Sequence, residues 1–227
     1  MEFLQILIFF IIFRYKKKGL EGSMNRLSLV LISSVALMFV ACGDSGNGAS
    51  PQSDVEGFLT DARDGQTYRT VTIGSQTWMA ENLNYKTDNS YCFDDKASNC
   101  SKYGRLYTWA AAITACPTGW HLPTKAEFET LFTAVGGQST AGKMLKSTSG
   151  WKKSGNSTDD YSFSALPAGY KLDDGDYGMG GYNAYFWSST EYNSNRAYRM
   201  DLDYGDDEAT LYYYDEVNGF SVRCVKD

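Results

Sequence analysis

The sequence predicts an α+β domain in which two helices precede a set of strands in an antiparallel sheet. Helical patterns occur at 106–115 and 124–135, and the chain after Gly150 is rich in aromatic and β-branched residues separated by clusters of Gly, Asn and Asp. Helices and strands that occur in separate runs are typical of α+β proteins. The predicted strands of this second part are 162–172, 184–190, 196–204, 209–214 and 220–225.

The first 41 residues predict a secretory signal. Met24-Asn25-Arg26 precedes the apolar run 27–40, and the small residue Ala41 stands before Cys42. A basic start, an apolar middle and a small residue at the cleavage point are typical of export signals. We therefore predict a signal region at 1–41, in which Met24 alone would start a signal of normal length. The alternative is an uncleaved anchor, although the run is shorter than the ~20 residues of a spanning helix.

Cys42 stands where bacterial lipoproteins carry their lipidated cysteine, although Phe39 replaces the usual Leu three residues earlier. We expect a lipid anchor on Cys42 and a place in the bacterial cell envelope. Gly43, rather than Asp, favours the outer membrane, with the domain exposed at the surface. Residues 42–54 are mostly Gly, Ser and other polar residues and predict a flexible tether, which leaves 55–227 as one domain.

The domain begins with a predicted hairpin and contains one well-marked helix. Residues 67–73 and 76–79 flank a Gly-Ser turn, a pattern typical of paired strands. The sequence Thr124-Lys-Ala-Glu127 is a capping box. Apolar residues follow at helical spacing until Gly136-Gly137 ends the pattern.

Four cysteines remain for disulfides, which export permits. Three pairings are open, and we favour Cys92–Cys100, which closes a short polar loop, with Cys116–Cys224, which joins a helix end to the last strand. In the chain-entropy description these bridges contribute about 2.5 and about 4.7 kcal/mol. Because the spacings lack a C-x-x-C pair and His121 is the single histidine, we predict no metal site.

Charge and motif content exclude several function classes. The first 41 residues carry five basic and two acidic side chains, so the net charge of the remainder is −9 against −6 for the whole chain. An acidic body without a basic cluster argues against a nucleic-acid partner. No G-x-S-x-G motif occurs, and the single His121 is expected to be a packed turn residue. We therefore expect no catalytic residue and no cofactor.

Several motifs occur in fixed order over about 57–227. They are TWMAENL (77–83), YGRLYTW (103–109), GWHLPT followed by EFE (119–129), LPAGY (166–170), FWSSTE (186–191) and GFSVRCV (219–225). In these motifs the chain resembles the Fibrobacter succinogenes major paralogous domain family. That family is similar to the C-type lectin-like superfamily and shares motifs with the formylglycine-generating enzymes.

The resemblance implies a C-type-lectin-like fold stapled by disulfides, and it supports the Cys116–Cys224 pairing. Members are typically exported lipoproteins without an assigned activity. The thiol chemistry of formylglycine-generating enzymes is not expected, because 192–222 contains no cysteine. The motifs of calcium-dependent lectins are also absent. The Asp-rich stretches 173–176 and 201–208 offer oxygen ligands, but turn chemistry explains both.

In lectin-like folds a long loop and the strand after it form the ligand face, which corresponds here to 170–195. Tyrosine offers contact area at low entropy cost. The alternative is that Trp187 and some tyrosines fill the core. The candidate ligand residues are Tyr177, Tyr182, Tyr185, Trp187, Glu191, Tyr192 and Asn193.

The sequence therefore predicts a non-catalytic ligand-binding or adhesion domain, with a polysaccharide or an envelope protein as partner and the membrane reached through Cys42. The alternative function is an architectural envelope lipoprotein, or a protein–protein interaction module without a small ligand.

Overall fold

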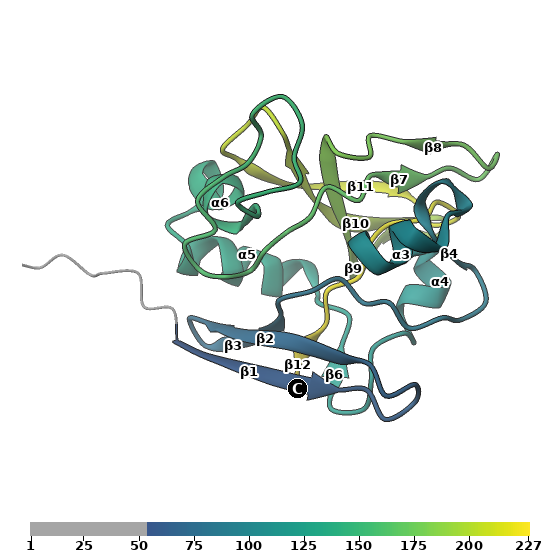
Figure 1. Cartoon of the computed structure of the whole chain (residues 1–227), viewed down its shortest axis with the longest axis horizontal. Coiled ribbons are helices and arrows are strands. Elements are labelled where there is room, and N and C mark those ends of the chain that lie inside the picture. The colour runs from purple at the N-terminus through teal and green to yellow at the C-terminus, as the bar shows by residue number, and fades with distance from the viewer. Residues whose placement is uncertain (1–53) are drawn as a thin grey trace, which may run out of the picture. The chain divides into compact units, whose positions relative to one another are not determined.

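A computed structural model describes residues 54–227 (Figure 1). The predicted signal region 1–41, the predicted lipidation site Cys42 and the predicted tether up to residue 53 lie outside the described residues. None of the helices in 54–227 has the length and apolar character needed to cross a bilayer.

The described part is a mixture of few helices with antiparallel sheets, as the sequence predicts. A five-stranded sheet has the spatial order β1-β2-β3-β12-β6. Its strands are β1 (Asp54–Thr60), β2 (Thr67–Ile73), β3 (Gln76–Met79), β12 (Val225–Lys226) and β6 (Trp120–His121). The predicted β2–β3 hairpin is confirmed, because Ile73 pairs with Gln76 across a two-residue turn in which Gly74 has a φ of 60°.

A second sheet has three antiparallel strands in the order β11-β10-β9. They are β9 (Asn183–Asn193), β10 (Arg196–Asp203) and β11 (Ala209–Asp215), close to three of the predicted strands. Two further pairs are β4 (Ser90–Tyr91) with β5 (Leu106–Tyr107), and β7 (Tyr170–Lys171) with β8 (Tyr177–Gly178).

The helices are short and lie beside the sheets (Figure 1). They are α3 (Ala97–Tyr103), α4 (Trp109–Ala112), α5 (Lys125–Ala134) and α6 (Gln138–Leu145), with a 3-10 turn η1 (Phe93–Asp95). In Figure 1, α5 and α6 lie together on one side of the domain and α3 and α4 on the other.

Helix α5 begins at the predicted capping box. The backbone N–H of Glu127 donates to Thr124 Oγ1 at 3.2 Å, and the Thr124 N–H donates to Glu127 Oε2 at 2.7 Å. Phe128 and Leu131 are fully buried on the inner face, where the Phe128 ring stacks on Trp78 at 5.5 Å. Burial of one such side chain stabilises the fold by roughly 1.5–3 kcal/mol.

Both favoured disulfides are present. Cys92–Cys100 has a Cα–Cα distance of 4.8 Å, and Cys116–Cys224 has one of 5.9 Å. The second bridge joins the segment after α4 to the residue before β12, which brings the last strand into the five-stranded sheet.

Three predicted elements were wrong in their extent. Residues 106–107 form a strand instead of starting a helix, because Tyr107 exchanges both backbone hydrogen bonds with Phe220. Helix α4 therefore covers only four residues. The predicted strand 162–172 is regular only at β7, and the predicted strand 220–225 only from Val225.

Arg223 explains much of that irregular structure. Its guanidinium is fully buried and donates to the carbonyl oxygens of Phe163, Ser164 and Met79 and to Asn82 Oδ1. The carbonyl groups of Phe163 and Ser164 thus turn toward this cation instead of toward a neighbouring strand. Burial lowers the pKa of Arg223 to about 9, so the side chain remains charged at neutral pH.

Candidate functional site

Two of the predicted ligand residues lie in the core. Trp187 is fully buried, and its indole N–H donates to the Tyr107 carbonyl at 2.8 Å. Tyr185 is 7 % exposed, and the Arg199 guanidinium carbon lies 4.2 Å from the centre of its ring. These side chains point inward from β9 and support it against Phe220. The alternative reading in which such residues fill the core therefore holds for both.

Tyr177 lies in β8 against the loop closed by Cys92–Cys100. Its hydroxyl donates to Asp95 Oδ1 at 2.6 Å, and its ring meets Phe93 edge to face at 5.5 Å. Burial and the Asp95 carboxylate raise the pKa of Tyr177. The side chain thus holds two loops together.

Tyr182 lies just before β9, half buried against Tyr204. The Lys152 ammonium lies 4.8 Å and the Lys153 ammonium 5.6 Å from the centre of its ring. Both lysines are exposed, so Tyr182 belongs to a small aromatic and basic surface.

Glu191, Tyr192 and Asn193 are all exposed at the far end of β9. A strand advances about 3.3 Å per residue, so Tyr182 and Tyr192 are separated by roughly 30 Å along β9. The predicted residues therefore do not form one binding site.

Tyr192 belongs to an aromatic cluster that extends over all three strands of the β9–β11 sheet. Its ring lies parallel to that of Tyr213, with centroids 3.6 Å apart, and Tyr198 meets both rings edge to face. Tyr212 stacks on Tyr213 at 4.8 Å. We call Tyr192, Tyr198, Tyr212 and Tyr213 the tyrosine surface. Tyr192 is 46 % exposed and Tyr212 is 54 % exposed.

Polar groups surround the tyrosine surface. Arg196 Nε donates to Asp215 Oδ1 at 2.7 Å, and the Lys125 ammonium lies 5.6 Å from the centre of the Tyr198 ring. Asn193 and Glu191 lie beside Tyr192 on β9. The tyrosine surface thus presents apolar ring faces next to hydrogen-bonding side chains, some positively and some negatively charged.

Sequence reasoning found Tyr192 but missed Tyr198. Tyr212 and Tyr214 are exposed as well. The pairing of Tyr198 with Tyr213 depends on the register of β10 against β11. No local pattern in the sequence specifies that register.

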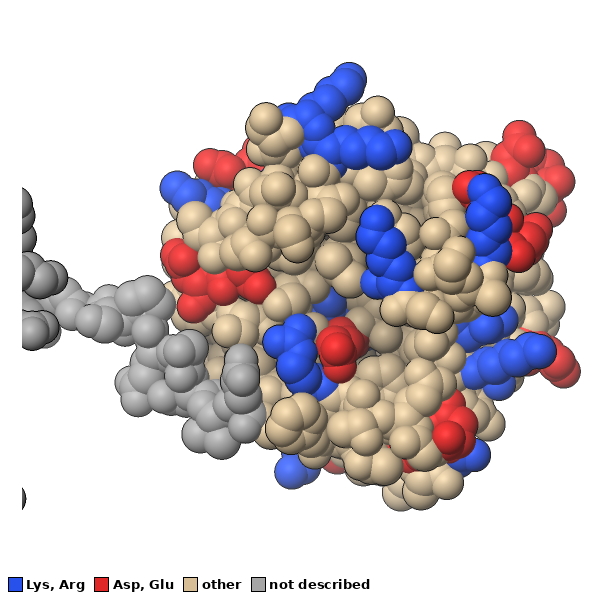
Figure 2. All heavy atoms as spheres, in the orientation of Figure 1, with Lys and Arg blue, Asp and Glu red and all other residues tan. Residues whose placement is uncertain are grey.

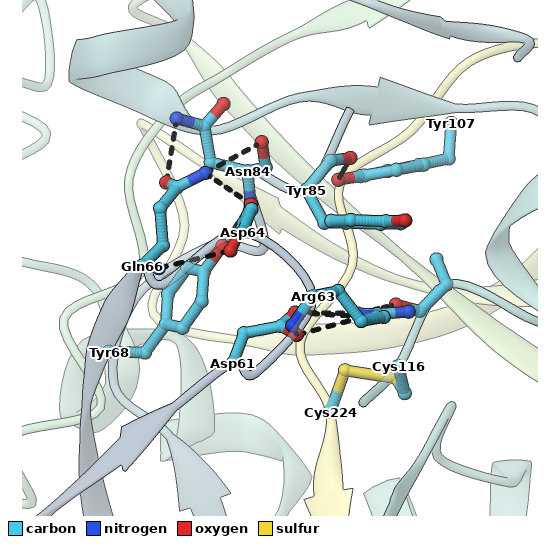
Figure 3. Close-up of polar contacts among 11 residues, drawn as sticks. Asp61, Arg63, Asp64, Gln66, Tyr68, Asn84, Tyr85, Tyr107, Cys116 and Cys224 are labelled. Carbon is cyan, nitrogen blue, oxygen red and sulfur yellow. Dashed lines mark hydrogen bonds and ion pairs between the residues drawn. A yellow bond between two sulfur atoms is a disulfide. The ribbon is translucent and has the colours of Figure 1, made fainter. Parts of the chain in front are cut away.

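A partly buried ion pair fixes the turn after β1 near the Cys116–Cys224 bridge (Figure 3). Arg63 donates to both carboxylate oxygens of the fully buried Asp61, and its Nη2 also donates to the Ala115 carbonyl at 2.7 Å. The guanidinium carbon lies 3.8 Å from the centre of the Tyr85 ring. Hydrogen bonds from Arg63 hold the pKa of Asp61 below its usual value. The charged groups of Asp61 and Arg63 are paired with each other, which favours a structural role for both residues.

The single histidine joins three segments. His121 Nδ1 lies 2.6 Å from Asp227 Oδ1, and Nε2 lies 2.8 Å from Glu127 Oε1. Partial burial lowers the pKa of His121, but the two carboxylates outweigh it and the net shift is upward. Both ring nitrogens can donate to carboxylates only in the charged imidazole, so the pairing favours that form.

An open cleft of about 160 Å³ lies between β2 and α3. Its lining is polar and includes Glu81, Asn84 and Tyr103. Glu81 accepts a hydrogen bond from the Arg69 backbone N–H at 2.7 Å, so this carboxylate of the cleft lining is already engaged with strand β2.

A lysine occupies the Asp-rich turn after β10. Lys146 is 2 % exposed, and its ammonium donates to the carbonyl oxygens of Asp203 and Asp206 at 2.9 and 2.7 Å. Burial lowers the pKa of Lys146. Within residues 54–227, no group of three or more His, Cys, Asp or Glu side chains is placed to hold a metal ion.

On the face seen in Figure 2, basic and acidic side chains are interspersed among neutral ones.

No curated protein and no solved structure matches this chain. The sequence profile of the Fibrobacter succinogenes major domain matches residues 71–226. That match covers the core strands, α5 and the long-range disulfide, so the chain belongs to the Fibrobacter succinogenes major domain family.

Proposed function

We propose that this protein is an exported lipoprotein, anchored through Cys42 in the outer membrane, whose domain binds a polysaccharide without catalysis. The observation that carries the proposal is the tyrosine surface at the end of the β9–β11 sheet. Aromatic faces cover the apolar C–H faces of sugar rings, and the neighbouring Asn193, Arg196 and Asp215 offer groups for sugar hydroxyls.

The tyrosine surface is ordered before a ligand arrives. Tyr192 packs on Tyr213 and Tyr198 at centroid distances of 3.6 and 5.7 Å. Side chains that are already held in place lose little conformational entropy on binding, which favours affinity. Tyrosine is also among the residues that most often dominate binding energy.

We further propose that the fold is C-type-lectin-like. The Cys116–Cys224 bridge, which joins the end of the chain to the segment after α4, supports this assignment. The segment 170–182, which contains the short β7–β8 hairpin and leads into β9, supports it as well. The proposed binding surface then lies at the Tyr192 end of β9, and not in the segment 170–182 that precedes the strand.

The test is polysaccharide pull-down and glycan-array binding by the full chain in detergent, with two matched variants. Tyr192→Ala removes a ring from the tyrosine surface, and Tyr182→Ala removes a ring from the opposite end of β9. One aromatic contact is worth roughly 0.5–1.5 kcal/mol, so we expect Tyr192→Ala to weaken binding about fivefold. Tyr182→Ala should leave binding within about twofold.

Thermal unfolding of both variants checks that the fold is intact. Loss of binding in Tyr182→Ala alone would move the ligand face to the surface shared by Tyr182 and the two lysines. The absence of polysaccharide binding by the unaltered chain would favour the architectural alternative.

A further inference from the structure

The Cys92–Cys100 disulfide lies beside a cation that is held in position. Arg105 Nη1 lies 3.3 Å from Cys100 Sγ and 3.7 Å from Cys92 Sγ. Its other nitrogens are fixed, because Nε donates to Ser90 Oγ at 2.9 Å and Nη2 donates to the Ser90 carbonyl at 2.8 Å. The guanidinium is therefore directed at the sulfur atoms by two independent hydrogen bonds.

The two sulfurs differ in access. Cys92 is partly exposed, whereas Cys100 is 7 % exposed within α3. An external thiolate therefore reaches Cys92 more easily, and attack there makes Cys100 the leaving group. A cation next to a sulfur stabilises its thiolate form, and a more stable thiolate leaves faster.

The loop that the bridge closes is strained. Asp94 and Asp95 both have a positive φ, 56° and 54°, in a region that non-glycine residues seldom occupy. Such residues persist only where surrounding contacts hold them, and each costs roughly 1–3 kcal/mol. Opening the bridge removes one of the constraints that keep them there.

The other bridge lacks the neighbouring cation and the positive φ values. Cys116, like Cys92, is partly exposed and Cys224 is fully buried, but among residues 54–227 no hydrogen-bond donor contacts either of these sulfurs. Cys116–Cys224 therefore serves as a reference within the same molecule.

We propose that Cys92–Cys100 is a thiol–disulfide exchange site that reacts with an external dithiol and is activated by Arg105. A thiolate of the dithiol attacks Cys92 Sγ, the Cys92–Cys100 bond breaks, and its electron pair leaves on Cys100 as a thiolate beside Arg105. The second thiol of the reagent loses its proton, attacks the mixed disulfide and releases Cys92, which takes up a proton. The dithiol is oxidised by two electrons, and the protein disulfide is reduced by two.

The two aspartates of the loop have polar partners of their own. Asp94 Oδ2 lies 3.5 Å from Lys96 Nζ, and Asp95 accepts the hydrogen bond of Tyr177. Arg105 is the cation that contacts the sulfurs. Both aspartates are on the exposed side of the loop, where solvent weakens their opposing charge.

Reduction is also transmitted to the β7–β8 hairpin. Tyr177 in β8 is held by Asp95 and by the Phe93 ring, and that ring packs on Gly180, where an added Cβ would lie 2.5 Å from Phe93 Cζ. All these contacts come from the loop inside the disulfide. Amide exchange at 177–180 should therefore become faster after reduction.

The test treats the full chain with a dithiothreitol redox couple, traps thiols by alkylation and counts them by peptide mass spectrometry. We expect Cys92–Cys100 to open at least about tenfold faster than Cys116–Cys224. Arg105→Gln should slow that step about tenfold, and Arg105→Lys, which keeps the charge, should slow it less. Equal rates for the two bridges, or an unchanged rate in Arg105→Gln, would overturn the proposal.

A second measurement separates activation from folding. In Cys92→Ser the Cys100 thiol is free, and the ultraviolet absorbance of its thiolate can be followed at neutral pH. An ordinary thiol is only a few per cent ionised at pH 7, and we expect at least about fivefold more here. A thiolate fraction no higher than that of an ordinary cysteine would overturn the proposal even if Arg105→Gln failed to fold.

Discussion

Replacement of Arg223 by Met tests whether one buried cation organises the irregular half of the domain. The side chain is fully buried and donates to four oxygen atoms, those of Phe163, Ser164, Met79 and Asn82. Methionine has a similar length but no donor, so the variant leaves these acceptors unsatisfied in the core.

The expected loss follows from that count of acceptors. Each buried acceptor that loses its donor costs roughly 1–3 kcal/mol, and the relief from no longer burying a charge offsets part of the sum. We expect the free energy of unfolding to fall by about 4 kcal/mol. For a domain of this size the midpoint of thermal unfolding should fall by about 8–16 °C.

The assay is denaturant unfolding with both disulfides intact, followed by tryptophan fluorescence and by circular dichroism to check that the two transitions coincide. Arg196→Met is the matched control, because Arg196 pairs with Asp215 on the exposed surface and its loss should leave the denaturation midpoint nearly unchanged. Arg223→Lys should also be destabilising, since a single ammonium cannot reach four acceptors. A loss below about 1 kcal/mol in Arg223→Met would refute the reasoning.

Three further predictions concern the elements that hold the chain together. Two carboxylates raise the pKa of His121, so its stabilising contribution is complete below its unfolded value of about 6.5 and is lost as pH rises through the folded value. The stability difference between the native chain and His121→Gln should therefore be larger at pH 5.5 than at pH 8.5, and a difference independent of pH would contradict it. Replacing Cys116 and Cys224 together with Ser should lower the free energy of unfolding by about 2–5 kcal/mol, and an unchanged denaturation midpoint would count against a stabilising bridge. Thr124→Ala should cost about 1 kcal/mol through loss of the α5 cap, whereas the exposed Thr130→Ala should cost less than about 0.5 kcal/mol; equal midpoints in thermal unfolding would show that the cap is not needed.

Local contacts are what the sequence predicts well here. The β2–β3 hairpin pairs residues at most nine positions apart, and the cap of helix α5 joins Thr124 to Glu127, so the patterns that encode both are visible in a short window. The disulfide pairing could also be chosen in advance, because one bridge closes a short loop and the other then follows.

The failures occurred where a distant residue decides the backbone. Tyr107 would continue into a helix by its propensity, but its backbone groups pair with Phe220, more than a hundred residues away. The stretch at 162–164 has strand-like composition, yet its carbonyl groups turn toward Arg223. Such partners compete successfully with local preference because a buried unpaired group costs more than a change of secondary structure.

By itself, the sequence predicted the family, the α+β class and the antiparallel strands, and it favoured the disulfide pairing that the structure shows. It also named Tyr192 as a candidate ligand residue, with burial in the core as the alternative. Only the tertiary structure decided that Trp187 faces the core while Tyr192, five residues later on the same strand, stacks on Tyr213 at the surface. The physical reason is that the side-chain direction in a strand depends on its register and bulges against neighbouring strands, and those are set by contacts that no local pattern contains.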